Sequence, residues 1–239
     1  KDTKVRHCEM YDKWLSAIAV CPLFRGIELE ELSSMLMCLK PKVEKYKKNE
    51  FIKIAGDEYE GLGIILSGSA AITKENSIGD RVIITVVKSG DMFGEMAAFS
   101  DQKKWPATVI AQEASQVMFM SSDIILGECP KLCRGHRFLI MNMLKIVSDK
   151  ALLLNKKLDY LSIKSIRGRI SSLLIDHYNK IGTLSFMMSL NRNEMADFLN
   201  VSRPALSREL CKLRDEGVLD FYKSSVVIKD IEALKLMAE

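Results

Sequence analysis

The sequence lacks the features that would place the protein in or across a membrane. It contains no run of about 18 consecutive apolar residues, the length that a membrane-spanning helix needs. Its start, at residues 1–10, is polar and charged, so it does not form the apolar core of a signal peptide. We therefore expect no membrane partner and no secretion.

Closely spaced cysteine pairs are also missing. The chain has six cysteines, and Cys8, Cys21 and Cys38 lie too far apart for the tight cluster that binds iron and sulfur. Cys129 and Cys133 could offer two thiolates to a metal, but no second pair of ligands follows, which favours packing roles. Reduced thiols without a disulfide framework are typical of the cytoplasm, where we expect the protein to act.

Histidine is scarce, with three in the chain: His7, His136 and His177. None falls among the expected strands, which argues against a metalloenzyme whose strands supply imidazole ligands. No pairing of a nucleophile with a base and no phosphate-binding loop is apparent. The sequence thus gives no catalytic residue and no support for an enzyme.

What is present indicates a globular protein of two modules. The 239 residues, with 48% hydrophobic content, can bury two modest cores, and the pattern changes from strands to helices in the second half. The net charge is only +4. Composition therefore neither requires nor excludes nucleic acid as a partner.

Short apolar segments dominate the first half of the chain. They follow two expected helices at 11–20 and 28–39, and glycines separate them. Strands of about five residues between glycine turns are typical of an antiparallel roll or barrel, which can hold a ligand. The expected strands are residues 51–55, 62–66, 70–73, 81–87, 107–111 and 117–120. A short helix is expected at 122–132.

A long helix is expected at residues 138–161, where apolar residues recur at alternating spacings of four and three. This heptad pattern favours a parallel coiled coil with a second copy of the chain. The seam consists of Ile140, Leu144, Val147, Ala151, Leu154, Leu158 and Leu161. A second row, which would pack on the chain's own domain, consists of Leu139, Met143, Ile146 and Leu153. The alternative is an ordinary buried helix of one globule.

One stretch near the C-terminus carries a more specific pattern. Asn191 and Glu194 have the spacing of a capping box at the start of a helix. Asn200 stands where a tight turn requires a left-handed residue, and Ser202 can cap a second helix. The inward positions of that second helix are occupied by Leu206, Leu210 and Leu213. The pattern predicts a helix-turn-helix.

The start of the second helix is the part that would reach base edges in the major groove of double-stranded DNA. Arginine there can form paired hydrogen bonds with guanine. A helix at 165–181 precedes the motif, and a hairpin wing at 218–222 and 226–229 follows it. The residues expected to contact DNA are Asn191, Arg192, Ser202, Arg203, Ser207 and Arg208. The alternative for the outward arginines is a solvated helix face.

The second helix and the glycine turns of the roll together resemble a known family. The run at 201–210, Val-Ser-Arg-Pro-Ala-Leu-Ser-Arg-Glu-Leu, and the turns at 55–57, 64–68 and 89–95 are similar to those of the Crp/Fnr transcription regulators. In the best-known members a glutamate stands where this chain has Pro204, so the preferred DNA sequence should differ.

The resemblance implies an α+β fold and a function. The fold is a cyclic-nucleotide-binding-like β-roll at 1–133, a dimerisation helix at 134–161 and a winged helix-turn-helix at 162–239. A homodimer would place two reading helices about 34 Å apart on a palindromic operator, with RNA polymerase as a further partner. Effector binding would shift an equilibrium between two states of the long helix. In an alternative, a ligand-binding protein uses its winged domain to contact another protein.

The nucleotide site of the family is altered in this chain. Gly94 and Glu95 fall where the family contacts the ribose, but Trp105 and Pro106 replace the arginine and serine that hold the cyclic phosphate. A phosphate needs a fork of donors or a cation, and tryptophan and proline supply neither. We therefore expect an effector other than cyclic AMP. The expected effector pocket consists of Gly94, Glu95, Met96, Trp105, Pro106, Met143 and Ile146.

In another alternative the protein is a regulator that senses nitric oxide or a similar gas through a bound haem. Gas sensors of similar architecture hold haem between the roll and the long helix, where His136, Met141 and Met143 could act as ligands. The plain interpretation is a histidine at the end of a helix and methionines that fill the core. The sequence alone does not identify the effector.

Overall fold

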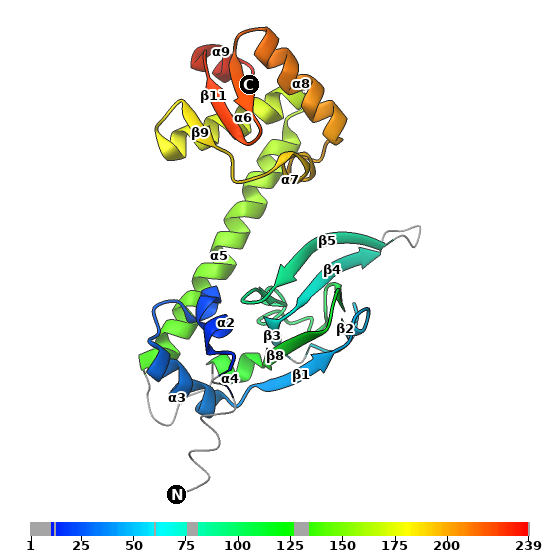
Figure 1. The fold of residues 1–239 in the computed structure, drawn as a ribbon, viewed down its shortest axis with the longest axis vertical. Coiled ribbons are helices and arrows are strands. Elements are labelled where there is room, and N and C mark those ends of the chain that lie inside the picture. The colour runs from blue at the N-terminus through cyan, green and yellow to red at the C-terminus, as the bar shows by residue number, and fades with distance from the viewer. Residues whose placement is uncertain (1–10, 12, 60, 76–80, 127–133, 239) are drawn as a thin grey trace, which may run out of the picture. The chain divides into compact units, whose positions relative to one another are not determined.

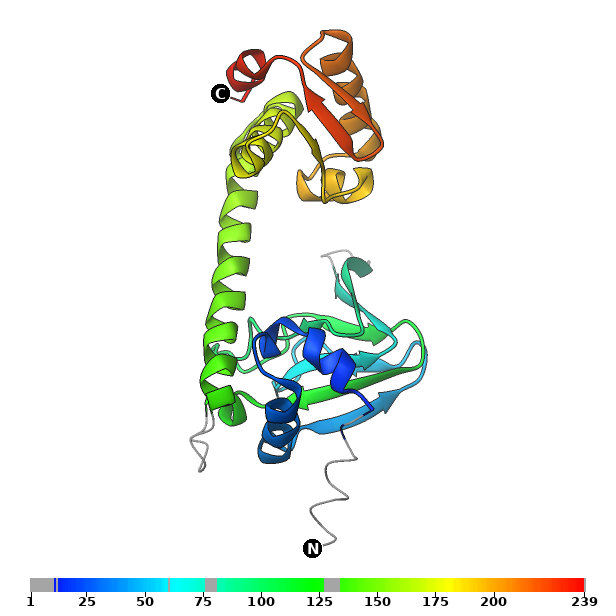
Figure 2. The same ribbon diagram turned by 60° about the vertical axis from the view of Figure 1, so that its left-hand side comes forward.

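The computed structural model describes Tyr11 and residues 13–59, 61–75, 81–126 and 134–238. The chain divides into two compact units, Lys1–Asp149 and Lys150–Glu239, and the division falls inside the longest helix (Figure 1, Figure 2). Each unit contains buried hydrophobic clusters of its own. The mixture of helices and antiparallel strands confirms the expected α+β fold.

The first unit is a β-roll of two antiparallel sheets with strand orders β1-β8-β3-β6 and β2-β7-β4-β5 (Figure 1). Its strands are β1 (Lys42–Tyr46), β2 (Phe51–Lys53), β3 (Leu62–Ser67), β4 (Ser69–Glu75), β5 (Arg81–Lys88), β6 (Met92–Phe93), β7 (Thr108–Ala111) and β8 (Ser115–Met120). The six expected strands are confirmed. The sequence pattern misses β1, whose residues are mainly charged, and β6, which has two residues.

Strand β3 is buried on both faces, because it lies between two hydrophobic clusters. Ile65 belongs to the cluster between the sheets, together with Trp105. Ile64 and Leu66 belong to the cluster on the helical side of their sheet. A strand that is covered on both faces requires a continuous apolar run, which β3 has.

Short helices cover one side of the roll. They are α2 (Leu15–Val20), the 3₁₀ helix η1 (Pro22–Phe24), α3 (Leu29–Leu39) and α4 (Ser122–Leu126). Helix α4 accounts for the first part of the helix expected at 122–132. Residues 127–133, which include Cys129 and Cys133, lie outside the described residues, and so does Cys8. No helix in the described ranges is long and apolar enough to cross a membrane.

The long helix α5 (Arg134–Ser162) begins four residues before its expected start. Leu139 and Met143 are buried in the helical-side cluster of the first unit. Asn142 fixes the helix to the turn after η1, since its Nδ2 atom donates to the backbone oxygens of Leu23 at 3.0 Å and Arg25 at 2.8 Å. This amide was not singled out from the sequence, because its partners are more than a hundred residues away.

Helix α5 also carries apolar side chains that its own chain leaves in water. Leu144, Leu154 and Leu158 of the expected seam are 59%, 53% and 64% exposed. Leu153, expected to pack on the chain's own domain, is 54% exposed, so that expectation is wrong. The reason is that packing of α5 against the first unit's core ends at Val147. The other seam residues are Ala151, which is exposed, and the half-buried Ile140, Val147 and Leu161.

The second unit contains the expected helices and hairpin. Its elements are α6 (Ile166–Ile181), β9 (Ser185–Met187), α7 (Arg192–Phe198), α8 (Arg203–Asp215), β10 (Leu219–Tyr222), β11 (Ser225–Ile228) and α9 (Ile231–Leu236). Strand β9 was not expected, and it pairs with β11 to complete a sheet of order β10-β11-β9. Tyr160 at the end of α5 is buried in this unit's core, and its hydroxyl donates to Asp176 Oδ2 at 2.6 Å.

Replacement of Asn142 by Ala should destabilise the first unit. The substitution removes the donor of two hydrogen bonds, and a net loss of about 1–2 kcal/mol in the free energy of unfolding is expected. Urea unfolding of the full chain, followed by circular dichroism, measures the change. Asn155→Ala removes the same amide from an exposed position on α5 and should change stability by less than about 0.5 kcal/mol. Equal effects of the two substitutions would contradict the role of Asn142.

Candidate nucleic-acid interface

Helix α7 begins at a complete capping box, which confirms the prediction from the sequence. Asn191 Oδ1 accepts hydrogen bonds from the backbone nitrogens of Asn193 at 2.9 Å and Glu194 at 3.1 Å. In return, the backbone nitrogen of Asn191 donates to Glu194 Oε2 at 2.7 Å. These bonds satisfy amide groups that the first turn of a helix otherwise leaves without partners. The start of α7 is therefore fixed by local chemistry.

The turn between α7 and α8 also has the expected form. Asn200 has a φ of 51°, in the left-handed region. Ser202 Oγ accepts from the backbone nitrogen of Ala205 at 3.4 Å and caps α8, and Pro204 lies in the first turn, where its missing amide costs nothing. The tight turn brings the start of α8 close to the end of α7.

The orientation of α8 is set by its apolar stripe. Leu206, Leu210 and Leu213 are buried in the core of the second unit. Because these positions point inward, Arg203 and Arg208 point outward and are exposed, and Ser207 is half-buried. The expected outward arginines are thus presented at the start of α8.

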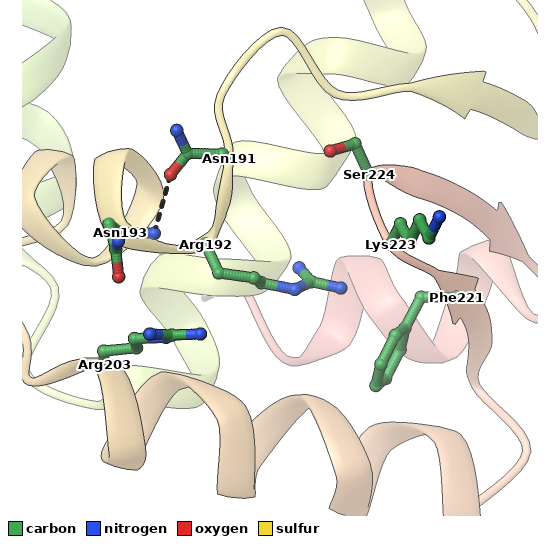
Figure 3. A pocket seen from close by; sticks show the side chains of 7 residues that line it. All are labelled: Asn191, Arg192, Asn193, Arg203, Phe221, Lys223 and Ser224. Atoms are coloured by element: carbon green, nitrogen blue, oxygen red, sulfur yellow. Dashed lines mark hydrogen bonds between the residues drawn. The ribbon is translucent and has the colours of Figure 1, made fainter.

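A pocket of about 410 Å³ lies where the starts of α7 and α8 meet the turn of the wing (Figure 3). Its lining residues are Asn191, Arg192, Asn193, Arg203, Phe221, Lys223 and Ser224. Figure 3 shows Arg192 extending from α7 toward Phe221 and Lys223 of the wing, with Arg203 beneath it on α8. The lining contains three cationic side chains and no acidic one, so the pocket suits an anion.

Four of these lining residues were not singled out from the sequence: Asn193, Phe221, Lys223 and Ser224. A lysine in the turn of the expected wing was a usable signal, because wing turns lie at the same end of the domain as the reading helix. Phe221 gave no signal, since alternate apolar residues in a strand usually indicate only core packing.

Helix α8 is anchored to α6 by a fork of ionic hydrogen bonds. Arg167 Nε donates to Glu209 Oε1 at 2.6 Å, and its two terminal nitrogens donate to Glu216 at 2.8 Å each. The bonds to Glu216 and Glu209 raise the pKa of Arg167, and the bond from Arg167 lowers the pKa of Glu209. Both effects favour the charged forms, so the fork stabilises the placement of α8 on its domain.

Within the roll, the expected effector region is filled by aromatic rings. Trp105 is 2% exposed, and its ring centroid lies 5.0 Å from that of Tyr59 and 5.9 Å from that of Phe93. Gly94 has a φ of +84°, and a Cβ atom added there would lie 2.7 Å from the Trp105 ring. The turn can therefore approach the indole only because residue 94 is glycine.

The polar groups around Trp105 do not form a phosphate site. Among the described residues, Trp105 Nε1 and the Tyr59 hydroxyl are buried without hydrogen-bond partners. Burial and the charge of Glu95 raise the pKa of Tyr59. Glu95 is buried and Pro106 is exposed. Trp105 and Pro106 supply neither a guanidinium fork nor a hydroxyl group for a cyclic phosphate, and the indole fills the space beside Gly94. Lys53 is a cation nearby, with its Nζ atom 5.9 Å from the indole centroid.

The expected effector pocket is not assembled as one site. Met143 is buried in the helical-side cluster, and Ile146 packs against that cluster. Trp105 belongs to the cluster between the sheets. Met96 is exposed. A small apolar pocket of about 100 Å³ adjoins Met143, lined also by Phe99, Ile125, Ile140 and Leu144. The structure therefore places the members of the expected pocket in different surroundings.

The three candidate haem ligands also lie apart. Met141 is exposed and Met143 is packed in the core. His136 is half-buried, and its Nε2 atom has no hydrogen-bond partner among the described residues. The pocket beside Met143, at about 100 Å³, is well below the roughly 300 Å³ from which ligand pockets usually start. These residues do not fit a haem.

Comparison with known families agrees with the two-unit organisation. Residues 43–129 match the family model of the cyclic nucleotide-binding domain, and residues 168–237 match that of the Crp-like helix-turn-helix domain. A roll of the first kind followed by a DNA-binding domain of the second defines a class of transcription regulators. The chain belongs to the Crp/Fnr family of this class.

Individual relatives are distant. The chain is 23% identical over 217 residues to the cyclic AMP receptor protein of Thermus thermophilus, which covers 91% of this chain and 96% of that protein. Its fold is similar to the catabolite activator protein of Thermus thermophilus, with a TM-score of 0.53, 23% identity and coverage of 91% and 98%. It is also similar to CprK in complex with OCPA, with a TM-score of 0.59, 14% identity and coverage of 87% and 93%.

Replacement of Arg167 by Gln should lower stability in a pH-dependent way. At neutral pH the loss is expected to be about 1–2 kcal/mol in the free energy of unfolding, since ionic hydrogen bonds to two carboxylates disappear. The pKa of Glu209 is lower in the folded than in the unfolded state. Its contribution is therefore complete above the unfolded pKa of about 4.3 and is lost as the pH falls through the folded value.

Urea unfolding of both chains at neutral pH and at a series of pH values that descends below the unfolded pKa of glutamate measures this difference, which should shrink as the pH falls. Arg214→Gln is the control, because Arg214 is exposed and its ion pair is with its neighbour Asp215 rather than with another helix. A difference between Arg167→Gln and the parent chain that is the same at all of these pH values would contradict the role of the fork.

Proposed function

We propose that the protein acts as a homodimer that binds a near-palindromic operator through α8 and that its β-roll responds to an effector other than cyclic AMP. The observation that carries the proposal is the capped, outward start of α8, which presents Arg203 and Arg208 beside a cation-lined pocket. Such a surface matches the edge of the major groove and the phosphates that flank it.

The contacts to DNA divide into two kinds. Arg203 and Arg208 are proposed to bond to base edges, with Ser202 and Ser207 beside them, and each paired contact of an arginine with guanine discriminates by about 1–3 kcal/mol. Asn191 and Arg192 at the start of α7 are proposed to bind the phosphate backbone. Pro204 offers no acceptor for a cytosine amine, so the preferred sequence differs from one that is read by glutamate there.

The proposed dimer forms along α5. Leu144, Leu154 and Leu158 lie on one stripe of the helix and are more than half exposed. An apolar stripe at heptad spacing is stabilised when a second identical helix covers it. A parallel pair would then set the two reading helices about 34 Å apart, the distance of one turn of DNA.

The proposed class of effector follows from the aromatic rings that fill this part of the roll. Trp105 takes the place of the phosphate-binding pair, and its indole lies against Gly94. Similar folds are named for different ligands, cyclic AMP in one relative and OCPA in another. Gly94, Glu95 and Trp105 remain our proposed contact residues for the effector. Such a ligand would shift the protein between two states only if it preferred one of them.

The proposed partners follow from this role. A regulator of transcription acts where the chromosome is, so we propose the cytoplasm as its compartment. RNA polymerase is the proposed protein partner, and it would contact the dimer bound at the operator.

Substitution of the outward arginines should weaken and broaden DNA recognition. A duplex of about 30 base pairs, selected from a random pool with the parent protein, is the probe. Arg203→Ala or Arg208→Ala should each reduce affinity by roughly 5- to 100-fold and relax base preference, since each removes a base contact. Arg214→Ala, at the far end of α8, is the control. Cyclic AMP added to the parent protein should leave its affinity for the duplex unchanged.

Unchanged affinity and base preference in both arginine variants would overturn the proposed interface. That outcome would favour the alternative in which the winged domain contacts a protein. A strong increase of affinity on addition of cyclic AMP would overturn the proposed effector class while leaving the DNA interface intact.

Charged substitutions along α5 should separate the dimer. Leu158→Glu buries an unpaired carboxylate in the proposed seam and should weaken self-association at least about ten-fold. Analytical ultracentrifugation over a range of concentrations measures the change. Leu152→Glu is the matched control, because Leu152 is exposed as much as Leu158, at 64%, but lies off the seam. Dissociation caused equally by both substitutions, or a monomeric parent protein, would contradict the seam.

A further inference from the structure

Arg192 is held in an unusual way for a basic side chain. Its guanidinium carbon lies 4.7 Å from the centroid of the Phe221 ring in strand β10 of the wing. Its Nη1 atom contacts the sulfur of Met195 at 3.9 Å, which is a weak acceptor. Its Nη2 atom is buried and has no hydrogen-bond partner among the described residues. The guanidinium is therefore held mainly by stacking on an aromatic ring.

The same ring contacts a second arginine, Arg214, whose charge is paired where that of Arg192, among the described residues, is not. Arg214 lies 5.6 Å from the Phe221 centroid, but it also pairs with Asp215 at 3.1 Å. Within the described part of the chain, Arg192 forms no ion pair with any carboxylate. Burial lowers the pKa of Arg192, although a guanidinium stays protonated in proteins. Arg192 thus keeps a partly desolvated charge and unused donors.

Arg192 lines the pocket of about 410 Å³ together with Arg203 and Lys223. An anion in that pocket would supply the acceptors that Arg192 lacks. A partly desolvated cation gains more from such an anion than a fully hydrated one does, because less water has to be displaced. In a protein that binds DNA, the anion of this kind is a phosphate of the duplex backbone.

We propose that Phe221 is a positioning residue that holds the guanidinium of Arg192 toward a backbone phosphate, so that the wing sets the strength of a contact made by the helix-turn-helix. This inference rests on the proposed DNA binding. Phe221 itself need not touch the DNA. Stacking restricts the rotamers of a flexible side chain before binding, which reduces the entropy lost when the phosphate contact forms.

The side chain at position 221 can be changed so that packing and stacking are separated. Phe221→Leu keeps an apolar side chain against the core but removes the face of the ring. Phe221→Tyr keeps the ring and adds a hydroxyl that the half-exposed position can hydrate. A purely structural role would distinguish these variants by stability alone, whereas a positioning role distinguishes them by the number of phosphate contacts.

The test measures the affinity of the full chain for the selected duplex over a range of salt concentrations. Phe221→Leu should weaken binding about 3- to 10-fold and reduce the slope of log affinity against log salt by up to about one, the value of one phosphate contact. Phe221→Tyr should bind as the parent does. Arg192→Gln should show the same loss of slope, and Arg192→Gln combined with Phe221→Leu should show no further loss.

Controls separate this role from general damage to the domain. Arg214→Gln removes the other arginine on the same ring and should leave the salt slope unchanged. Base preference should be preserved in Phe221→Leu, because phosphate contacts carry no sequence information. Thermal unfolding of each variant establishes that it is folded at the temperature of the assay. If Phe221→Leu is not folded there, Phe221→Met replaces it, with the same expected result.

Two results would overturn the inference. One is a salt slope in Phe221→Leu equal to that of the parent, and the other is a loss in Phe221→Tyr as large as that in Phe221→Leu. Failure of the proposed function looks different, since the parent protein would then bind no duplex or Arg203→Ala would leave binding unchanged.

Discussion

The fold depends on a constraint in α5, which carries more apolar surface than its own chain can bury. Leu139 and Met143 pack into the first unit, and Tyr160 packs into the second. Burial of each such side chain contributes about 1.5–3 kcal/mol, which is enough to fix the helix at both ends. Leu144, Leu154 and Leu158 on the seam remain more than half exposed in the chain itself. The helix is therefore fixed by its own chain at both ends, and the exposed leucines between them are the part that our proposed dimer would cover.

The arginines of the second unit fall into two groups. One arginine is bonded to carboxylates and holds the fold, and others are exposed at the start of α8. All three nitrogens of the Arg167 guanidinium donate to Glu209 or Glu216, and these bonds fix α8 on α6. Arg203 and Arg208 have no such task, because the caps and the leucine stripe already set the start of the helix. This division explains how a domain with nearly balanced charge presents a cationic face where the starts of α7 and α8 meet the wing.

Local chemistry decides which features could be predicted from the sequence. The capping box at Asn191, the left-handed turn at Asn200 and the helical periodicity of α5 depend on neighbours in the chain, and the cap, the turn and the long helix are confirmed. Features that depend on distant partners were missed. Strand β1 looks like a charged surface segment, and the amide of Asn142 finds its acceptors only in the folded unit. The stacking of Arg192 on the wing is a contact of the same kind.

The close fit between Gly94 and the indole of Trp105 limits how the roll can change its ligand during evolution. Replacing the indole by a side chain without a ring system would leave a void where the ring now packs against Tyr59 and Phe93. Loss of a buried tryptophan costs about 3–5 kcal/mol, a large part of the stability of a small domain. A change of the side chain at position 105 would therefore require compensating substitutions among the neighbouring core residues to keep the roll stable.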